Sequence, residues 1–114
     1  MKTIIVDTNF LIYCAKFKID FFSEIDRLML TNYKIVTLNT IIEELEKVKP
    51  KELKLIKRFL EKVEIIKTNE KKVDKELQFL SSKDFIIATQ DRELKQKLKG
   101  PKIIIRQKKY LELK

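Results

Sequence analysis

Two stretches of the chain follow one pattern: Ile4-Ile5-Val6-Asp7-Thr8-Asn9 near its start and Phe85-Ile86-Ile87-Ala88-Thr89-Gln90-Asp91 near its end. In each, a short and largely β-branched run leads to an aspartate, small polar residues lie beside it, and a helical pattern follows. Such a run predicts a buried parallel strand that carries its acid to the carboxyl edge of a sheet, where open α/β folds place their sites. We therefore expect Asp7 and Asp91 to meet at one edge, on neighbouring strands.

The rest of the chain alternates between strand and helix patterns. Strands are expected over residues 3–6, 34–38, 64–67, 85–88 and 102–105, and residues 107–114 form a short tail. Helical periodicity follows residue 6 and begins again near residues 19, 39, 50, 71 and 91, with Pro50 in a first turn. This alternation predicts an α/β fold: a three-layer α/β/α domain over residues 1–114, with a parallel sheet of about five strands.

Composition excludes several classes of site. Gly100 is the only glycine, so a Gly-rich phosphate loop or dinucleotide fingerprint is excluded. The chain has no histidine and one cysteine, Cys14, so we expect neither covalent acyl chemistry nor an internal disulfide. We expect a buried, unreactive thiol there. The sequence has no apolar run near the length of a membrane span and no signal peptide, which indicates a cytoplasmic protein.

The net charge of +9 is concentrated near the end of the chain. Residues 92–114 contain nine Lys or Arg and two acids. A basic segment beside an acidic site favours a polyanionic substrate that is held through its phosphates. A chain rich in Lys and Ile, with 38% charged residues, is also typical of a heat-adapted or AT-rich source, so the charge alone leaves both explanations open.

Two more carboxylates, Glu44 and Asp74, lie near the starts of predicted helices. Thr40 and Glu43 have the spacing of a capping box, in which each side chain satisfies a free backbone donor, so Glu43 is predicted to be structural. Glu44 lies one residue further on, about 100° around the helix and near the same sheet edge, so it is predicted to be functional.

Each of these acids also has a simpler interpretation. Asp7 and Asp91 suit helix N-caps, and Glu44 suits an exposed acid stabilised by the helix dipole. Asp74 suits a solvated first-turn acid, which its spacing alone favours. Four carboxylates at one edge would repel each other unless a cation neutralised them. With no histidine, the ligands are oxygen atoms, which favours Mg²⁺ or Mn²⁺. Such an ion activates water and stabilises charge at a phosphoryl centre.

These motifs together resemble the PIN-domain family. The resemblance rests on residues 5–9, on Ile41-Ile42-Glu43-Glu44-Leu45, and on residues 86–94, in this order along essentially the whole chain. Residues 105–110 are similar to an archaeal branch related to eukaryotic ribosome-biogenesis PIN proteins, and VapC-type toxin nucleases are more distantly similar. The resemblance implies a compact α/β/α fold and a metal-dependent ribonuclease that prefers single strands.

Residue roles follow from the resemblance position by position. The implied catalytic and metal-binding cluster is Asp7, Glu44, Asp74 and Asp91, and the implied supports of the carboxylates or of bound water are Thr8, Asn9 and Thr89. The branch often has a second Asp where this chain has Lys75, and this difference puts a second metal in doubt. The branch usually has an Asn before the last Asp, where this chain has Gln90. We expect Glu93 to substitute in part for the missing acid.

The expected function is a Mg²⁺- or Mn²⁺-dependent endoribonuclease acting on single-stranded RNA, in rRNA processing or as a toxin nuclease. The expected RNA contacts are Arg92, Lys95, Arg106, Lys108 and Lys109. One alternative is a degenerate domain that binds RNA or a ribosome-assembly partner without cleavage, which Lys75 favours. Another is a protein-interaction domain without nucleic acid. A homodimer stays open, and no membrane contact is expected.

Overall fold

The sheet is the framework of the molecule. In this computed structural model, which describes residues 1–69, 72–81 and 85–114, six strands form one sheet in the order β3-β2-β1-β4-β5-β6. The strands are β1 (Lys2–Val6), β2 (Tyr33–Leu38), β3 (Glu64–Ile66), β4 (Phe85–Ala88), β5 (Lys102–Arg106) and β6 (Tyr110–Leu113). Every pairing is parallel except that of β5 with β6. The expected α/β fold is confirmed.

Strand β1 lies in the centre because its side chains are apolar on both faces. Ile4, Ile5 and Val6 are completely buried, and burying each such side chain contributes about 1.5–3 kcal/mol. β1 pairs with β4 in a register that sets Val6 opposite Ala88. The stretches over residues 4–9 and 85–91 are therefore neighbours, as expected, and the carboxyl ends of their strands lie at one edge of the sheet.

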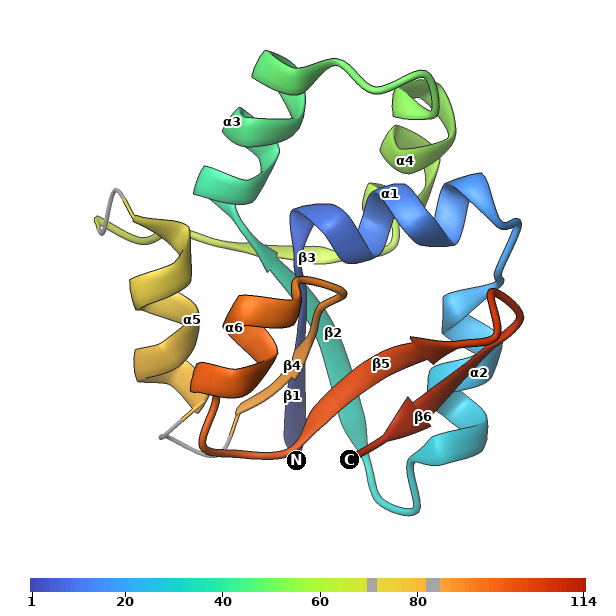
Figure 1. The fold of residues 1–114 in the computed structure, drawn as a ribbon, viewed down its shortest axis with the longest axis vertical. Helices are drawn as coiled ribbons and strands as arrows, with labels where there is room; N and C mark the ends of the chain where they lie inside the picture. The colour runs from blue at the N-terminus through green and yellow to red at the C-terminus, as the bar shows by residue number, and fades with distance from the viewer. Residues whose placement is uncertain (70–71, 82–84) are drawn as a thin grey trace.

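Helices surround this edge and the two faces. They are α1 (Thr8–Lys16), α2 (Phe21–Leu28), α3 (Asn39–Val48), α4 (Leu53–Leu60), α5 (Val73–Ser81) and α6 (Arg92–Lys97). Figure 1 shows α1, α3 and α4 gathered where β1 and β2 end, α5 and α6 together on one side, and α2 beside β6 on the other. Within the described residues, no helix is long and apolar enough to cross a bilayer.

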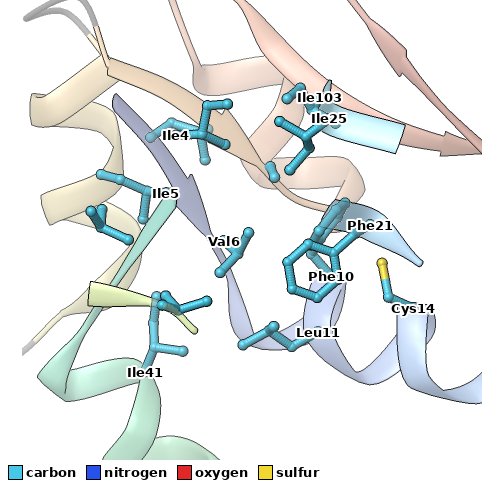
Figure 2. Packing of buried hydrophobic residues seen from close by; sticks show 14 of the residues in the cluster. Ile4, Ile5, Val6, Phe10, Leu11, Cys14, Phe21, Ile25, Ile41 and Ile103 are labelled. Carbon is cyan, nitrogen blue, oxygen red and sulfur yellow. The ribbon is translucent and has the colours of Figure 1, made fainter. Parts of the chain in front are cut away.

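The core joins β1 to the helices through aromatic and branched side chains. Figure 2 shows Phe10 of α1 against Phe21 of α2, and their ring centroids are 5.8 Å apart in an edge-to-face arrangement. Phe21 also meets Phe59 of α4, at 5.1 Å. Cys14 is buried in the same cluster, and this burial raises the pKa of its thiol, as expected for an unreactive cysteine. These contacts fix α1, and hence its first residues, against the sheet.

Two expectations about local structure are wrong. The tail contains a strand, β6, because Leu111 is buried when it pairs with Ile105 of β5. The predicted capping box does not form: α3 begins at Asn39, so Thr40 lies inside the first turn and its buried hydroxyl has no hydrogen-bond partner among the described residues. Glu43 is exposed and has no capping role.

Two helix boundaries also differ from expectation. Pro50 lies before α4 rather than in its first turn, and its carbonyl accepts a hydrogen bond from the Leu53 N–H. The helix expected to begin near residue 71 is α5, which covers Val73–Ser81, and residue 71 itself lies outside the described part of the chain. This helix buries Leu77 in the core.

Candidate active site

Asp7 links the end of β1 to the start of α1. It is the N-cap of α1, and its Oδ1 accepts a hydrogen bond of 2.7 Å from the Thr8 N–H. Its other oxygen, Oδ2, accepts a bond of 2.8 Å from the hydroxyl of Thr89, which follows β4. The residue is only 6% exposed. Asp7 is therefore held in one orientation by groups from both neighbouring strand ends.

The buried position changes the acidity of Asp7. Burial raises its pKa from 3.8 to about 6, against the opposing effect of the hydrogen bonds from Thr89 and Thr8. The negative charges of Glu44 and Asp74 raise the pKa further. Three of the four expected acids therefore act on one another electrostatically, which is the pattern of carboxylates arranged around a site.

Asp91 is connected to Asp7 through Thr89. The Thr89 hydroxyl donates to Asp7 and accepts a bond of 3.1 Å from the Asp91 N–H. The Asp91 carboxylate caps α6 by accepting a bond of 3.1 Å from the Leu94 N–H. The N-cap interpretation is thus confirmed for both aspartates, and the same contacts bring their backbones to one sheet edge.

Glu44 and Asp74 face each other across the opening between α3 and α5. Both line one groove of about 540 Å³, and Glu44 also borders a second groove of about 540 Å³ that it shares with Asn39 and Thr68. Both acids are exposed, but partial burial and the nearby Asp74 raise the pKa of Glu44. Glu44 therefore lies where the two grooves join.

Thr8 contributes a polar atom that the fold leaves unused. Its Oγ1 is buried and makes no hydrogen bond of ordinary geometry with the described residues. It is nevertheless close enough to the Glu44 carboxylate to lower the pKa of that group. A buried hydroxyl without a partner is costly, at about 1–3 kcal/mol, and marks a position where a bound group or water belongs.

The described residues do not form a closed metal cage. Among them, no three carboxylates are close enough together to enclose an ion. Asp7, Glu44 and Asp74 act on one another, while the Asp91 carboxylate faces its own helix. Asn9 and Glu93 are both exposed, and the roles expected of them stay predictions.

Sequence reasoning missed the lysines around the grooves. Lys47 lines the groove shared with Thr68, and Lys72, Lys75 and Lys97 line the groove shared with Asp74. Only the packing of α3, α5 and α6 brings these four together, so no local pattern identifies them. In the sequence, Lys75 stands out only because the similar proteins often have an Asp at this position.

Asn39 is another polar group that was missed. It follows β2 as Asp7 follows β1, and its side chain accepts a bond of 2.8 Å from the Thr68 N–H after β3. Its position after a strand was the available signal. Gln90 likewise links strand ends, because its side-chain oxygen accepts a bond of 2.9 Å from the Ile105 N–H.

The expected RNA contacts divide between two places. Burial, and then the positive charges of Arg106, Arg92 and Lys114, lower the pKa of Lys95, so these residues form one basic cluster over α6 and β5. Arg106 also pairs with Glu112 at 3.3 Å. Lys108 and Lys109 lie instead on the turn between β5 and β6.

Comparison with known proteins identifies the family of this chain. A family model described as a PIN-like domain matches residues 4–108. Ribonuclease VapC4 of Methanocaldococcus jannaschii is 39% identical over a 127-position alignment that covers 99% of this chain and 97% of that protein.

Two solved structures share the fold. The PIN domain endonuclease Utp24 superposes with a TM-score of 0.82 at 23% identity, covering 98% of this chain and 90% of that one. VapBC2 from Rickettsia felis, bound to a DNA fragment from its promoter, gives 0.59 at 16% identity, covering 91% of this chain and 99% of that one.

Proposed function

Because the chain belongs to the PIN-like domain family, we propose that it is a metal-dependent endoribonuclease that hydrolyses phosphodiester bonds of single-stranded RNA. The observation that carries this proposal is the buried Asp7, held by Thr89 at the carboxyl edge of the sheet within electrostatic reach of Glu44 and Asp74. Its homologue VapC4 is a ribonuclease, which supports the reaction class.

The donor set fits Mg²⁺ or Mn²⁺. Mg²⁺ usually keeps several waters and is bound by one or two carboxylates together with substrate phosphates, so a closed cage is not required. Asp7 and Glu44 would hold the ion together with water, Asp74 would add its negative charge nearby, and the unused Thr8 hydroxyl would supply another oxygen. Asp91 is the fourth acid of the proposed site. The ion would supply Lewis acidity toward the phosphate and lower the pKa of water.

The protein groups have distinct tasks in this proposal. Thr89 and the Thr8 N–H keep Asp7 oriented, and a pKa of about 6 leaves it ionised near neutral pH. Glu44 lies at the junction of the grooves, and its raised pKa makes it a stronger base than an ordinary surface glutamate, so it is the proposed proton acceptor for the attacking water. Burial around Asp7 excludes bulk water, which strengthens its interaction with a cation.

The lysine-lined grooves are the proposed path for the RNA backbone. Lys47, Lys72, Lys75 and Lys97 border the openings beside Glu44 and Asp74. They neutralise phosphates on either side of the bond that is cut, and the cluster around Lys95 extends this positive surface along α6. Such contacts favour any single strand and carry little sequence information.

Two biological settings match this activity. The likeness to VapC4 supports a toxin nuclease, and the likeness of fold to the endonuclease Utp24 is compatible with an enzyme that cuts single-stranded regions of rRNA. We place the reaction in the cytoplasm, where a lone buried thiol such as Cys14 stays reduced.

A second candidate is an RNA-binding domain that does not cut. Lys75 favours this candidate, because its positive side chain lies next to Asp74 in the groove. Its charge partly neutralises the carboxylate, so a metal ion is bound there less strongly. In this case the lysines bind RNA and the acids remain as helix caps and groove walls.

One assay distinguishes the two candidates. Labelled single-stranded RNA is incubated with the protein and Mn²⁺, with EDTA, and with excess Mn²⁺ restored, and the same RNA is tested after annealing to its complement. We expect internal cleavage of the single strand with Mn²⁺, none with EDTA, and recovery on restoration. Binding without cleavage under all conditions supports the second candidate, and equal cleavage with EDTA contradicts the metal requirement.

A further inference from the structure

An aromatic pair lies at the end of α1, with Tyr13 exposed and Phe17 half-buried against the core. The rings of Tyr13 and Phe17 are stacked, with centroids 5.5 Å apart and planes 25° apart. Tyr13 remains 38% exposed although it is a large aromatic side chain. The hydrophobic core uses Phe10, Leu11 and Cys14 from the same helix, so Tyr13 is not needed to fill it.

Positive charges flank the pair from two elements. The ammonium group of Lys16 is 6.0 Å from the centroid of the Phe17 ring. The ammonium group of Lys108, on the turn between β5 and β6, is 5.5 Å from the same centroid. Aromatic rings with cations beside them are what single-stranded nucleic acid needs, because its bases stack on the rings and its phosphates pair with the cations.

The turn that carries Lys108 is built in an unfavourable backbone conformation. Gln107 and Lys108 both have positive φ, 52° and 56°, and the Lys109 N–H closes the turn by donating to the Arg106 carbonyl at 3.0 Å. Turns of this kind favour Asn-Gly or Gly, because side chains are strained there. Lys108 therefore occupies a strained backbone position, with its ammonium group over the Phe17 ring.

A groove of about 340 Å³ lies beside Tyr13. Asn9, Ile12, Tyr13 and Lys16 line it from α1, and residues 50–52, which precede α4, also line it. Asn9, Tyr13 and Lys16 are four and three residues apart, so they share one face of the helix. A helix rises about 1.5 Å per residue, so Tyr13 lies about 9 Å along α1 from Asp7.

We propose that Tyr13 and Phe17, with Lys16 and Lys108, form a stacking subsite for one unpaired base of the bound RNA, a short distance along the strand from the bond that is cut. This inference rests on the proposed function, because it assigns part of the same RNA. The base lies against Tyr13 in the groove beside α1, and its neighbouring phosphates meet Lys16 and Lys108. Base-paired RNA cannot offer a free base face, so the subsite selects single strands.

The test measures binding without cleavage. A fluorescein-labelled oligoadenylate and an abasic ribose-phosphate oligomer of equal length are titrated with protein in EDTA, and affinity is read by anisotropy. The variants are Tyr13→Ala, Tyr13→Phe and Lys108→Gly, with Lys2→Gln as a charge-matched control at the amino end of β1, away from the groove. Thermal melts accompany each variant.

The subsite predicts a specific pattern. Tyr13→Ala weakens oligoadenylate binding by about fivefold or more, the effect of losing one stacked base, but leaves the abasic oligomer unaffected. Tyr13→Phe keeps the ring and binds both as the wild type does. Lys108→Gly weakens both oligomers and lowers the salt slope by about one, while its melting temperature does not fall, because glycine relieves the positive φ. Lys2→Gln binds both nearly as tightly as wild type.

Contrary outcomes distinguish a failure of the stacking subsite from a failure of the proposed function. If wild type binds and cleaves RNA while Tyr13→Ala binds oligoadenylate equally well, the subsite is wrong and the proposed function stands. If Tyr13→Ala loses affinity for both oligomers alike, the ring does not stack a base and the subsite is again wrong. If wild type binds neither oligomer, RNA binding itself is contradicted, and the subsite with it.

Discussion

Asp7 combines two tasks that sequence reasoning had treated as alternatives. One carboxylate oxygen caps α1 through the Thr8 N–H, and the other is held by the Thr89 hydroxyl. A cap normally lies near the surface and is well solvated, whereas this one is buried and its pKa is raised to about 6. The cap therefore holds a buried carboxylate in place, and the ionised form of this carboxylate lowers the free energy of unfolding.

The first prediction concerns that cost. Between pH 3.8 and about pH 6 the native protein keeps a proton on Asp7 that the unfolded chain has released, so the free energy of unfolding falls as pH rises through this window. The loss amounts to about 3 kcal/mol and persists at higher pH. Asp7→Asn removes the charge, so we expect it to be about 1–3 kcal/mol more stable than wild type near pH 8.

Urea unfolding of both proteins in metal-free buffer, near pH 8 and near pH 4, measures this effect. The gap should shrink near pH 4, where Asp7 is largely protonated in the native wild type. A gap of equal size at both values would mean that the charge of Asp7 does not destabilise the fold.

The second prediction separates the adjacent acids of α3. Glu44 acts on Asp7 electrostatically, whereas Glu43 is exposed and not engaged in a cap. A ligand that binds only the native state raises the melting temperature. We expect Mn²⁺ to raise it for wild type and for Glu43→Gln, but much less for Glu44→Gln. In metal-free buffer Glu44→Gln should melt no lower than wild type, because repulsion with Asp7 and Asp74 is relieved.

Thermal melts with and without Mn²⁺ on the three proteins provide the comparison. Glu43→Gln is the matched control, since it removes the same charge from the next position of one helix. A lost Mn²⁺ response in Glu43→Gln together with a normal one in Glu44→Gln would reverse the assignment.

At the level of elements, α2 fastens the end of the chain. Glu24 Oε1 accepts a bond of 2.9 Å from the Leu111 N–H on β6, and Arg27 donates a bond of 2.8 Å to the Leu111 carbonyl. Glu24 and Arg27 also pair with each other at 3.0 Å. Two side chains on one helix therefore complete both backbone groups of a buried strand residue, on the side that has no neighbouring strand in the described sheet.

The third prediction tests this fastening. Glu24→Ala leaves the Leu111 N–H without its partner, so we expect a loss of about 1–3 kcal/mol in the free energy of unfolding. The hydrogen bond from Arg27, and then that from the Leu111 N–H, hold the pKa of Glu24 below its usual value. Urea unfolding measures the loss against Glu61→Ala, an exposed acid, as a control. A difference of only a few tenths of a kcal/mol between the variants would show that β6 is held by other contacts.

The elements divide by how local their signals are. The strand from Phe85 to Ala88 was predicted with its observed bounds, because a β-branched run between polar residues is a local signal. Strand β6 was missed because only Leu111 and Leu113 mark it, and its partners are β5 and α2. The capping box failed because Asn39 continues directly from β2 into α3 and uses its side chain on Thr68.

At the scale of the whole molecule, positive side chains that contribute to the net charge of +9 gather in two places. Lysines line the grooves beside Glu44, and the cluster around Lys95 covers α6 and β5. The placement of the Asp7 and Asp91 backbones at one sheet edge followed from the sequence, because both residues come after neighbouring parallel strands. The positions of the lysines and of the aromatic pair did not follow from the sequence, because helix packing and a strained hairpin bring these residues together.

The fourth prediction follows from this placement. Binding of single-stranded RNA should weaken with salt by a slope of about 0.7 per phosphate contact, so four contacts give about a 50-fold loss for a fourfold rise in salt. Lys97→Gln should reduce the slope by roughly one contact. Anisotropy titrations in EDTA from low to physiological salt measure it, and a flat response would contradict a phosphate-binding surface.

RNA cleavage by Asp7→Asn is the decisive experiment for the proposed site, because the substitution keeps the shape of the buried side chain at its centre. Cleavage of labelled single-stranded RNA in Mn²⁺ is compared with wild type after both have been shown to be folded by thermal melts. We expect Asp7→Asn to be at least as stable as wild type near pH 8 and to cut RNA at least about 100-fold more slowly. A folded Asp7→Asn that cuts RNA at the wild-type rate would mean that Asp7 is not part of the catalytic site.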